Sequence, residues 1–405
     1  LARSPDGRWW VVADRTQAPS GAGYALENRG VVARALPELY RAAGVQPLVP
    51  FFEGFRDSLA ALAPADVMEP GEEPLIVVLT PGPYNETYFE HAFLAREMGF
   101  PLVEGQDLTV RDEKVFLRTL DGLRPVHVIL RRVDDIWCDP LELRDDSALG
   151  VAGLVGAVRA GTVTVANALG SGILETGALL GYLPRLAEHL LGHKLRMPSV
   201  ATWWCGEPAA CEYALEHLRE LVVKPSYPAV GETPVFCRDL PAAELEALAA
   251  RIEARPFDFV AQEMVNISQA PVLAADEAPG AGLVARNIGL RVFVAAGPDG
   301  FQAMPGGLIR VASEADMRIV SMQYGGGSKD AWVLSTPLTR RPAARIVPGQ
   351  IAPPERGPRH LSLSSRVAEN FFWLGRYSER ADVAARLGSE TLARLSGLGI
   401  PDVAA

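Results

Sequence analysis

The chain has 405 residues, of which 48% are hydrophobic and 22% are charged, so it has the composition of a globular protein of two or three domains. Its net charge of -10 and the lack of a basic run exclude a nucleic-acid surface, and no apolar stretch reaches the roughly 20 residues of a membrane span. The four cysteines have neither CxxC nor His-paired spacing, so we expect reduced thiols in a cytoplasmic protein.

The first 134 residues predict a strand, a helix and then a small α/β unit. Residues 75–79 form a continuous apolar run, which is typical of a buried parallel strand. A helix and a second strand after it complete a β–α–β unit, and a hairpin turned at Asp112-Glu113-Lys114 follows. The expected elements are strands at 9–12, 75–79, 101–103, 108–110, 115–117 and 126–130 and helices at 23–36 and 88–98.

The loop that follows the first buried strand carries Tyr84, Asn85 and Glu86. Ligands bind beside the carboxyl ends of strands in open α/β sheets, so these three residues are candidate substrate contacts. A turn that only caps the next helix explains the same residues equally well.

The middle of the chain predicts alternating helices and strands, among them the strand 221–225 that carries Lys224. A lysine within an apolar strand indicates contact with an anion, although a lysine whose head reaches the surface is the alternative. The expected elements are helices at 149–160, 207–218 and 239–255 and strands at 163–166, 221–225, 259–263 and 290–294.

Two glycine clusters interrupt the apolar runs between residues 304 and 334. Gly325, Gly326 and Gly327 lead directly into Ser328 and Lys329. Successive glycines can present backbone N–H groups to an anion, and the lysine adds a positive charge. A hairpin turn with a solvated Lys–Asp pair is the alternative.

The C-terminal part begins with a Pro- and Arg-rich stretch at 336–360, which we interpret as a linker. An amphipathic helix over 364–388 follows. We expect its Phe371, Leu374 and Tyr377 to pack against this chain or a neighbour, because such an apolar face is rarely left in water.

The segments PGGLIRVA (305–312) and VSMQYGGGSKDAWVL (320–334) resemble the end of the catalytic region of circularly permuted type-2 ATP-grasp proteins, a group similar to glutathionylspermidine synthase. SRVAENFFWLGRYSERAD (365–382) resembles the start of the helical alpha-E domain. The resemblance implies a mixed α/β (α+β), circularly permuted ATP-grasp fold with a helical C-terminal segment. It divides the chain into a permuted N-terminal segment (1–71), a small α/β unit (72–134), the ATP-grasp core (135–335), the linker (336–360) and the alpha-E start (361–405).

The same resemblance implies roles for residues along the chain. Lys224 would lie against the α-phosphate and adenine of ATP, and Glu263 would meet the nucleotide from the hinge strand. The residues around the phosphates, with catalytic or nucleotide-binding roles, would be Arg291, Arg310, Lys329, Gly325, Gly326, Gly327 and Ser328. The substrate-binding residues would be Ser20, Arg131 and Arg132 together with Tyr84, Asn85 and Glu86.

Asp14 is the residue of the N-terminal loop that could ligate magnesium, because relatives have E-D-N where this chain has Ala13, Asp14 and Arg15. Gly177 stands where relatives have a lysine, and Pro228 and Pro234 lie where relatives have a glycine-rich flap.

Two functions follow from the resemblance. The first is an ATP- and Mg2+-dependent carboxylate–amine ligase that works through an acyl phosphate, acting on a peptide, amino acid or amine in a peptide-modification pathway with alpha-E, transglutaminase-like or proteasome-related partners. The second is a catalytically degenerate ATP-grasp scaffold that binds a peptide or partner domain.

Overall fold

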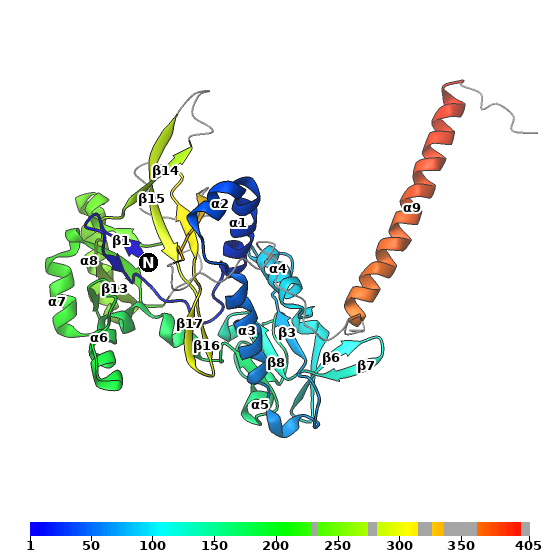
Figure 1. Ribbon diagram of the computed structural model, residues 1–405, viewed down its shortest axis with the longest axis horizontal. Helices are drawn as coiled ribbons and strands as arrows, with labels where there is room; N and C mark the ends of the chain where they lie inside the picture. The colour runs from blue at the N-terminus through cyan, green and yellow to red at the C-terminus, as the bar shows by residue number, and fades with distance from the viewer. Residues whose placement is uncertain (228–232, 274–281, 315–325, 336–362, 398–405) are drawn as a thin grey trace, which may run out of the picture.

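The computed structural model describes residues 1–227, 233–273, 282–314, 326–335 and 363–397. Its first sheet is parallel, with the strand order β4-β3-β8-β9, and lies on the right of Figure 1. The bounds of its strands are β3 Ile76–Leu79, β4 Leu102–Val103, β8 Val128–Arg131 and β9 Thr164–Ala166. The sheet therefore extends beyond residue 134, where the sequence placed the end of the α/β unit.

Both faces of this parallel sheet are covered, which explains the continuous apolar run of β3. Ile76 and Val78 pack into a core with three helices, whereas Val77 and Leu79 pack into a second core on the opposite face. The elements that form the two covers are α1 Ala22–Ala35, α3 Val49–Ala61, α4 Tyr88–Met98, α5 Leu154–Arg159, β5 Leu108–Arg111 and β6 Lys114–Thr119, and the exposed strand β7 Gly122–Pro125 pairs with β6. Alternation along one strand thus divides the core into two layers.

The second sheet is antiparallel, with the order β10-β13-β11-β12, and lies on the left of Figure 1. Leu221 and Val223 point from β11 into a core closed by α7 and α8. The bounds here are α6 Gly177–Leu191, β10 Thr202–Trp204, α7 Pro208–Glu216, β11 Leu221–Pro225, β12 Val235–Phe236, α8 Ala242–Ala254 and β13 Phe259–Glu263. The other face of this sheet is left for the site described below.

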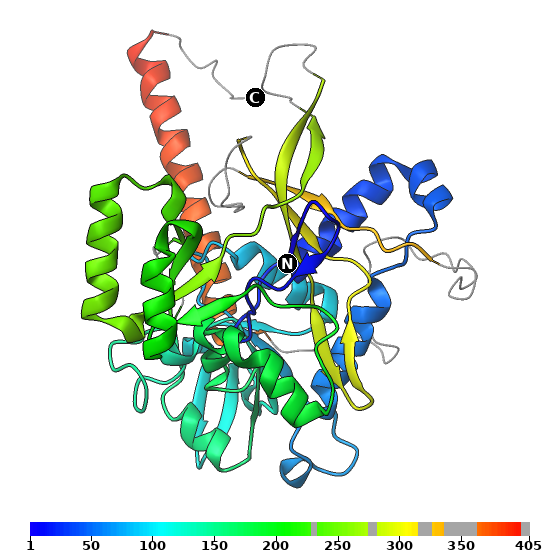
Figure 2. The ribbon, with the colours of Figure 1, turned by 90° about the vertical axis from the view of Figure 1, so that its left-hand side faces the viewer.

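The third sheet, in the order β14-β15-β18-β19, lies between the other two (Figure 1). The N-terminal hairpin, dark blue in Figures 1 and 2, runs between this sheet and the second one. The remaining bounds are β1 Ala2–Arg3, β2 Trp9–Trp10, α2 Pro37–Ala43, β14 Gln269–Leu273, β15 Leu283–Arg291, β16 Val294–Gly297, β17 Gly300–Ala303, β18 Leu308–Val311 and β19 Gly327–Asp330.

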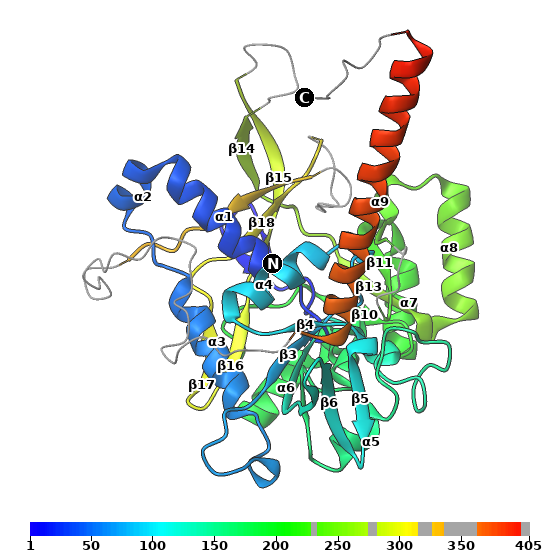
Figure 3. The same cartoon turned by 90° about the vertical axis from the view of Figure 1, so that its right-hand side faces the viewer.

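The C-terminal helix α9, Ser365–Leu395, projects from the rest of the chain (Figures 1 and 3). Arg366 anchors its first turn by ion pairs to Glu104 at 3.0 Å and Asp107 at 2.8 Å. The expected packing of Phe371, Leu374 and Tyr377 against this chain is absent from the part that the structure describes, because their side chains are 61%, 62% and 58% exposed. The helix itself, and with it the mixed fold with a helical C-terminal segment, is confirmed.

The start of one predicted helix and the end of one predicted strand differ from the observed bounds. The helix expected from residue 149 begins only at Leu154, because Gly153 has a φ of +86°, which a helix does not allow. The strand expected at 290–294 is broken between Arg291 and Val294, where Phe293 turns inward and is buried in the first core. The helices α2, α3 and α6 were not predicted, although α3 carries a helical apolar spacing at Phe51, Phe52, Phe55 and Leu59.

Candidate functional site

A cavity of about 400 Å³ lies on the other face of the second sheet, where it is lined by the sheet, α6 and the N-terminal loop. In the register of β11 and β13, Val222 pairs with Gln262 and Lys224 pairs with Val260, so all four side chains share the face that lines the cavity. The alternate residues of the same strands pack into the core with α8. The alternation of β11 therefore delivers a lysine to a wall that it shares with two valines and Gln262.

Lys224 is held on this wall by Gln262, whose Oε1 accepts a hydrogen bond from the lysine Nζ. Gln262 is itself fixed, since its Nε2 donates to Thr202 Oγ1 at 3.0 Å. Burial, followed by the charge of Arg15, lowers the pKa of Lys224 to about 8. The ammonium group is thus partly desolvated and lies near a second cation, which favours the binding of an anion.

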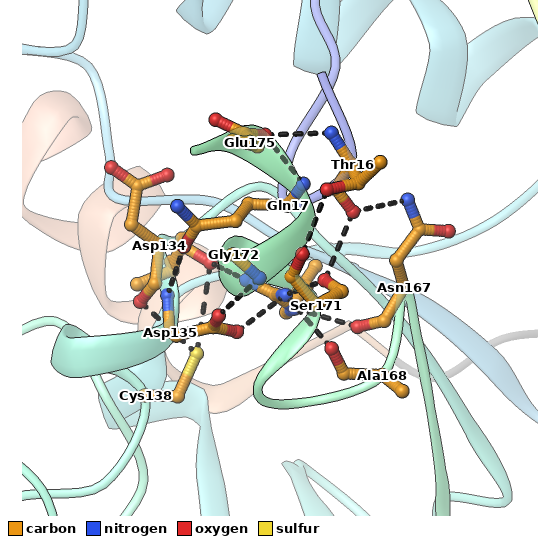
Figure 4. A network of polar contacts seen from close by, with 12 residues as sticks. Thr16, Gln17, Asp134, Asp135, Cys138, Asn167, Ala168, Ser171, Gly172 and Glu175 are labelled. Carbon is orange, nitrogen blue, oxygen red and sulfur yellow. Dashed lines mark hydrogen bonds and ion pairs between the residues drawn. The ribbon is translucent and has the colours of Figure 1, made fainter. Parts of the chain in front are cut away.

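The opposite wall comes from the N-terminal loop, where Asp14 and Arg15 line the cavity. This loop is fastened to residues 171–175 through Glu175, whose Oε1 accepts hydrogen bonds from the backbone N–H groups of Thr16 at 2.6 Å and Gln17 at 2.8 Å (Figure 4). The other oxygen of Glu175 forms an ion pair with Arg15 Nη1 at 3.2 Å. One buried carboxylate thereby fixes the path of the loop.

Two arginines of the third sheet add to the positive charge. Gly289 pairs with Arg310 in the register of β15 and β18, which places Arg291 diagonally from Arg310 on the same face. Arg310 lines the cavity, and burial followed by the charge of Arg15 lowers its pKa. Burial, then Arg310, then Arg15 lower the pKa of Arg291 to about 10. Arg15, Lys224, Arg291 and Arg310 therefore form one cluster, which we call the cationic cluster.

Arg291 also contacts Ser20, because its Nη1 donates to the Ser20 carbonyl at 2.6 Å and to Ser20 Oγ at 3.1 Å. The structure thus brings together Lys224, Glu263, Arg310 and Asp14 as lining residues of one cavity and places Arg291 and Ser20 beside them. These residues come from distant parts of the chain. Ser20 and Arg291, which are in contact, are separated by 271 positions.

Arg131, which we expected to contact substrate, is buried and bound to groups of the protein itself. Its guanidinium is fully buried and donates to the carbonyls of Asn167, Val133 and Ala168 and to Ser171 Oγ at 2.7–3.1 Å. It also forms an ion pair with Asp135 at 2.6 Å. Figure 4 shows Asn167, Ala168, Ser171 and Asp135 gathered in this network. The geometry favours a structural role, in which the arginine ties the end of β8 to residues 167–171.

Arg132 and Glu90 hold the backbone around Ser20. Arg132 Nη1 donates to the Pro19 carbonyl at 2.6 Å, and Glu90 Oε1 accepts from the N–H groups of Gly21 at 2.6 Å and Gly23 at 2.9 Å. Burial lowers the pKa of Arg132, while the Glu90 carboxylate opposes this shift. Sequence reasoning missed Glu90, although a carboxylate on the apolar side of a predicted helix is an available signal.

The loop with Tyr84, Asn85 and Glu86 lies apart from the residues that line the cavity. Tyr84 is fully exposed, and Asn85 Oδ1 accepts from Thr87 N at 2.9 Å and Thr87 Oγ1 at 2.6 Å. These bonds fit the alternative interpretation of a turn at the start of α4.

The structure describes two of the three residues of the second glycine cluster. Gly325 lies outside the described residues, and Gly327, Ser328 and Lys329 belong to β19, where they pair with Val311, Arg310 and Ile309 of β18. Ser328 Oγ accepts from Asn28 Nδ2 at 3.0 Å. From Gly327 onward this segment is therefore an edge of the third sheet rather than a turn, and Gly326 directly precedes it.

A protein-held magnesium ion does not fit the donors in the cavity. Glu175 has one oxygen committed to two N–H groups and the other to Arg15, and burial raises the pKa of Asp14. Across the described ranges, no three His, Cys, Asp or Glu side chains gather where they could hold a metal. Asp14 and Glu263 remain as lining carboxylates, which fall short of the several oxygens that magnesium requires.

Gly177 is a lining residue at the first position of α6. A Cβ atom added there would meet Val260 Cγ2 at 3.4 Å, which is ordinary van der Waals contact, so the site has room for a side chain. Of the two prolines in the flap segment, Pro234 lines the cavity and Pro228 lies outside the described residues. None of the helices that the structure describes is long and apolar enough to cross a membrane.

Comparison with known proteins identifies the fold to which this cavity belongs. Residues 1–312 match the family described as circularly permuted ATP-grasp type 2, and residues 363–401 match Alpha-E, a predicted alpha-helical domain with a conserved ER motif. A glutathione synthetase-like effector from Globodera pallida aligns over 82% of this chain and 73% of its own with a TM-score of 0.46 and 12% identity.

Two similar proteins carry names that record no function. An uncharacterized protein of Mycobacterium tuberculosis, Rv2567, is 43% identical over 96% of this chain, which spans 42% of the length of that relative. An uncharacterized protein of Synechocystis, sll0335, is 38% identical over 82% of this chain and 68% of its own length. The family match over residues 1–312 and these identities together show that the chain belongs to the circularly permuted ATP-grasp type 2 family.

Proposed function

We propose that the cavity binds ATP and that the chain forms the ATP-grasp part of a ligase that joins a carboxylate to an amine. In this chemistry the γ-phosphoryl group moves from ATP to the carboxylate, which gives an acyl phosphate and ADP. The amine then attacks the acyl carbon, and phosphate leaves as the amide bond forms. The substrate is a peptide, an amino acid or another small amine.

The observation that carries the proposal is the placement of Lys224, Arg15 and Arg310 around one cavity whose sheet wall includes the apolar side chains of Val222 and Val260. Apolar side chains suit a purine ring, and cations beside them suit phosphates. Phosphoryl transfer depends mainly on positioning and on neutralising charge, which is what such a cluster supplies. Arg291, beside Arg310, would complete this shell.

A second candidate function is a degenerate ATP-grasp scaffold that binds a peptide or a partner domain without turnover. Gly177, where relatives have a lysine, favours it, because the wall of the cavity opposite Val260 then carries no charge. The carboxylates that do not form a metal cage favour it as well. If this second function holds, phosphate release by the 405-residue chain stays close to background, since loss of one such electrostatic element costs on the order of 10²–10³ in rate.

Binding and turnover are tested separately. Calorimetric titration of the chain with ATP, compared with Lys224→Ala, measures binding, and the variant should bind at least about tenfold more weakly because a charged contact is lost. Equal binding by both proteins would contradict the placement of ATP against Lys224. Phosphate release is then measured with ATP, magnesium and a mixture of amino acids and polyamines. Release that disappears in Lys224→Ala would establish the ligase over the scaffold.

A further inference from the structure

Arg15 lies in the cavity wall, where its charge acts on the other three members of the cationic cluster. Its side chain is 47% exposed and lines the cavity, while its partner Glu175 is only 7% exposed. The ion pair uses Nη1 at 3.2 Å, so Glu175 does not engage Nε and Nη2 of the guanidinium. Glu175 therefore orients the guanidinium without removing it from the cavity.

The loop that carries Arg15 is rigidly positioned. Besides the Glu175 bonds, Thr16 Oγ1 donates to the Ser171 carbonyl at 2.8 Å, and Asn167 Nδ2 donates to the Thr16 carbonyl at 2.7 Å. Figure 4 shows these contacts on both sides of Thr16. The position of Arg15 is thus set by its neighbours in the sequence, which is what a preorganised charge requires.

The same geometry works against a divalent cation in this place. A metal near Glu175 would have to displace two backbone donors and the Arg15 ion pair. It would also meet the charges of Lys224 and Arg310 across the cavity, and Arg15 already lowers the pKa of both. A polyanion meets the carboxylates of Asp14 and Glu263 in the lining, but it displaces neither the Glu175 hydrogen bonds nor the Arg15 ion pair, and the cationic cluster attracts it.

We propose that Arg15 supplies, as a fixed part of the protein, the positive charge that a divalent metal would otherwise bring, so that the cavity binds a nucleoside polyphosphate in its metal-free form. This inference rests on the proposed nucleotide site and specifies the form of the ligand. Arginine suits the task, because its planar fork pairs with phosphate oxygens while another edge stays on a carboxylate.

The test is calorimetric titration of the 405-residue chain with ATP, once in excess EDTA and once in excess magnesium. We expect ATP to bind in EDTA and the affinity to stay equal or fall when magnesium is added. Arg15→Gln should weaken binding in EDTA by roughly 10- to 100-fold, because one charged contact is lost. Arg15→Lys should lose less affinity than Arg15→Gln, since it keeps the charge but not the planar fork. Arg8→Gln is the matched control, because Arg8 is a 73% exposed arginine of the N-terminal hairpin.

Each outcome separates this inference from the proposed function. If the wild-type chain binds ATP only when magnesium is present, the metal-free form is wrong and the nucleotide site stands. Unaltered binding by a folded Arg15→Gln variant would show that another group supplies the charge. If ATP binds under neither condition, the proposed function itself fails. Thermal unfolding of each variant shows whether it is folded. If Arg15→Gln does not fold, the ATP affinity of Arg15→Lys in EDTA is compared with that of the wild-type chain instead.

Discussion

Arg29 and Asp330 are 301 residues apart in the chain and form a fully buried ion pair, with Arg29 Nε 2.6 Å from Asp330 Oδ2. Their side chains are 1% and 2% exposed. Arg29 also donates to the carbonyls of Gln46 at 2.6 Å and Ala331 at 2.7 Å. The pair thereby joins α1 to β19 at the edge of the third sheet, beside the strand that carries Arg310.

We expect Arg29→Met to lower the free energy of unfolding by about 3–5 kcal/mol, because Asp330 would keep a buried charge without its partner. Urea denaturation of the two proteins measures the difference. Arg34→Met is the control on the same helix, since Arg34 forms an exposed pair with Glu27 at 3.5 Å and should cost less than about 1 kcal/mol. A similar loss in both variants would show that burial of the Arg29 pair is not what matters.

The lowered pKa of Lys224, about 8, predicts that nucleotide binding weakens as pH rises from 7 to 9. Below this pKa the lysine is protonated and attracts phosphate, and above it the lysine is neutral. Bound phosphate shifts the midpoint upward, because it favours the protonated form. Titrations with ATP at several pH values measure the trend, and Lys224→Arg should flatten it. A pH-independent affinity in the wild-type chain would exclude a role for the Lys224 charge.

The same shift has the opposite effect on stability. The folded pKa lies below the ordinary lysine value of 10.5, so between about pH 8 and 10.5 the unfolded chain binds more protons than the folded one. The contribution of Lys224 to the free energy of unfolding therefore rises with pH in this window. At pH 7, Lys224→Met should be more stable than wild type by on the order of 1–2 kcal/mol, and this gain should shrink toward pH 10. Urea denaturation at pH 7 and 10 checks both signs.

Gly177→Lys should strengthen ATP binding by roughly tenfold, because the position lines the cavity and an added Cβ atom meets Val260 at ordinary contact distance. Titration calorimetry measures the gain. Gly177→Ala is the matched control, since it removes the glycine without adding charge and should leave binding unchanged. An equal gain from alanine would mean that helix α6 was stabilised rather than that a phosphate contact was added.

Arg366→Ala should release the first turns of α9, because Arg366 pairs with Glu104 and with the buried Asp107. The cost should be about 1–3 kcal/mol, since Asp107 loses charged hydrogen bonds. Faster hydrogen exchange near residue 367 would show the release. Arg386→Ala should change little, because its pair with Asp382 is exposed and lies within the helix. Unchanged exchange in Arg366→Ala would show that other contacts hold this end.

The sequence predicted the strands at 75–79, 221–225 and 259–263 closely, because their apolar runs are local signals that burial enforces. It also singled out Lys224, since a charge inside an apolar strand is visible without a structure. It predicted the start of α5 and the end of β15 less well, because Gly153 and Phe293 act through a backbone angle and a distant core. These are properties that a linear pattern does not carry.

Local sequence thus determined which residues form strands and helices and which ones carry an unusual charge. Only the tertiary structure decided what each charge does. Arg131 and Lys224 both follow apolar residues in buried strands, yet Arg131 spends its donors on backbone carbonyls and Asp135, whereas Lys224 faces the cavity. The difference arises because the neighbours of a side chain come from segments far away in the chain, and those neighbours determine whether its charge is satisfied internally or left for a ligand.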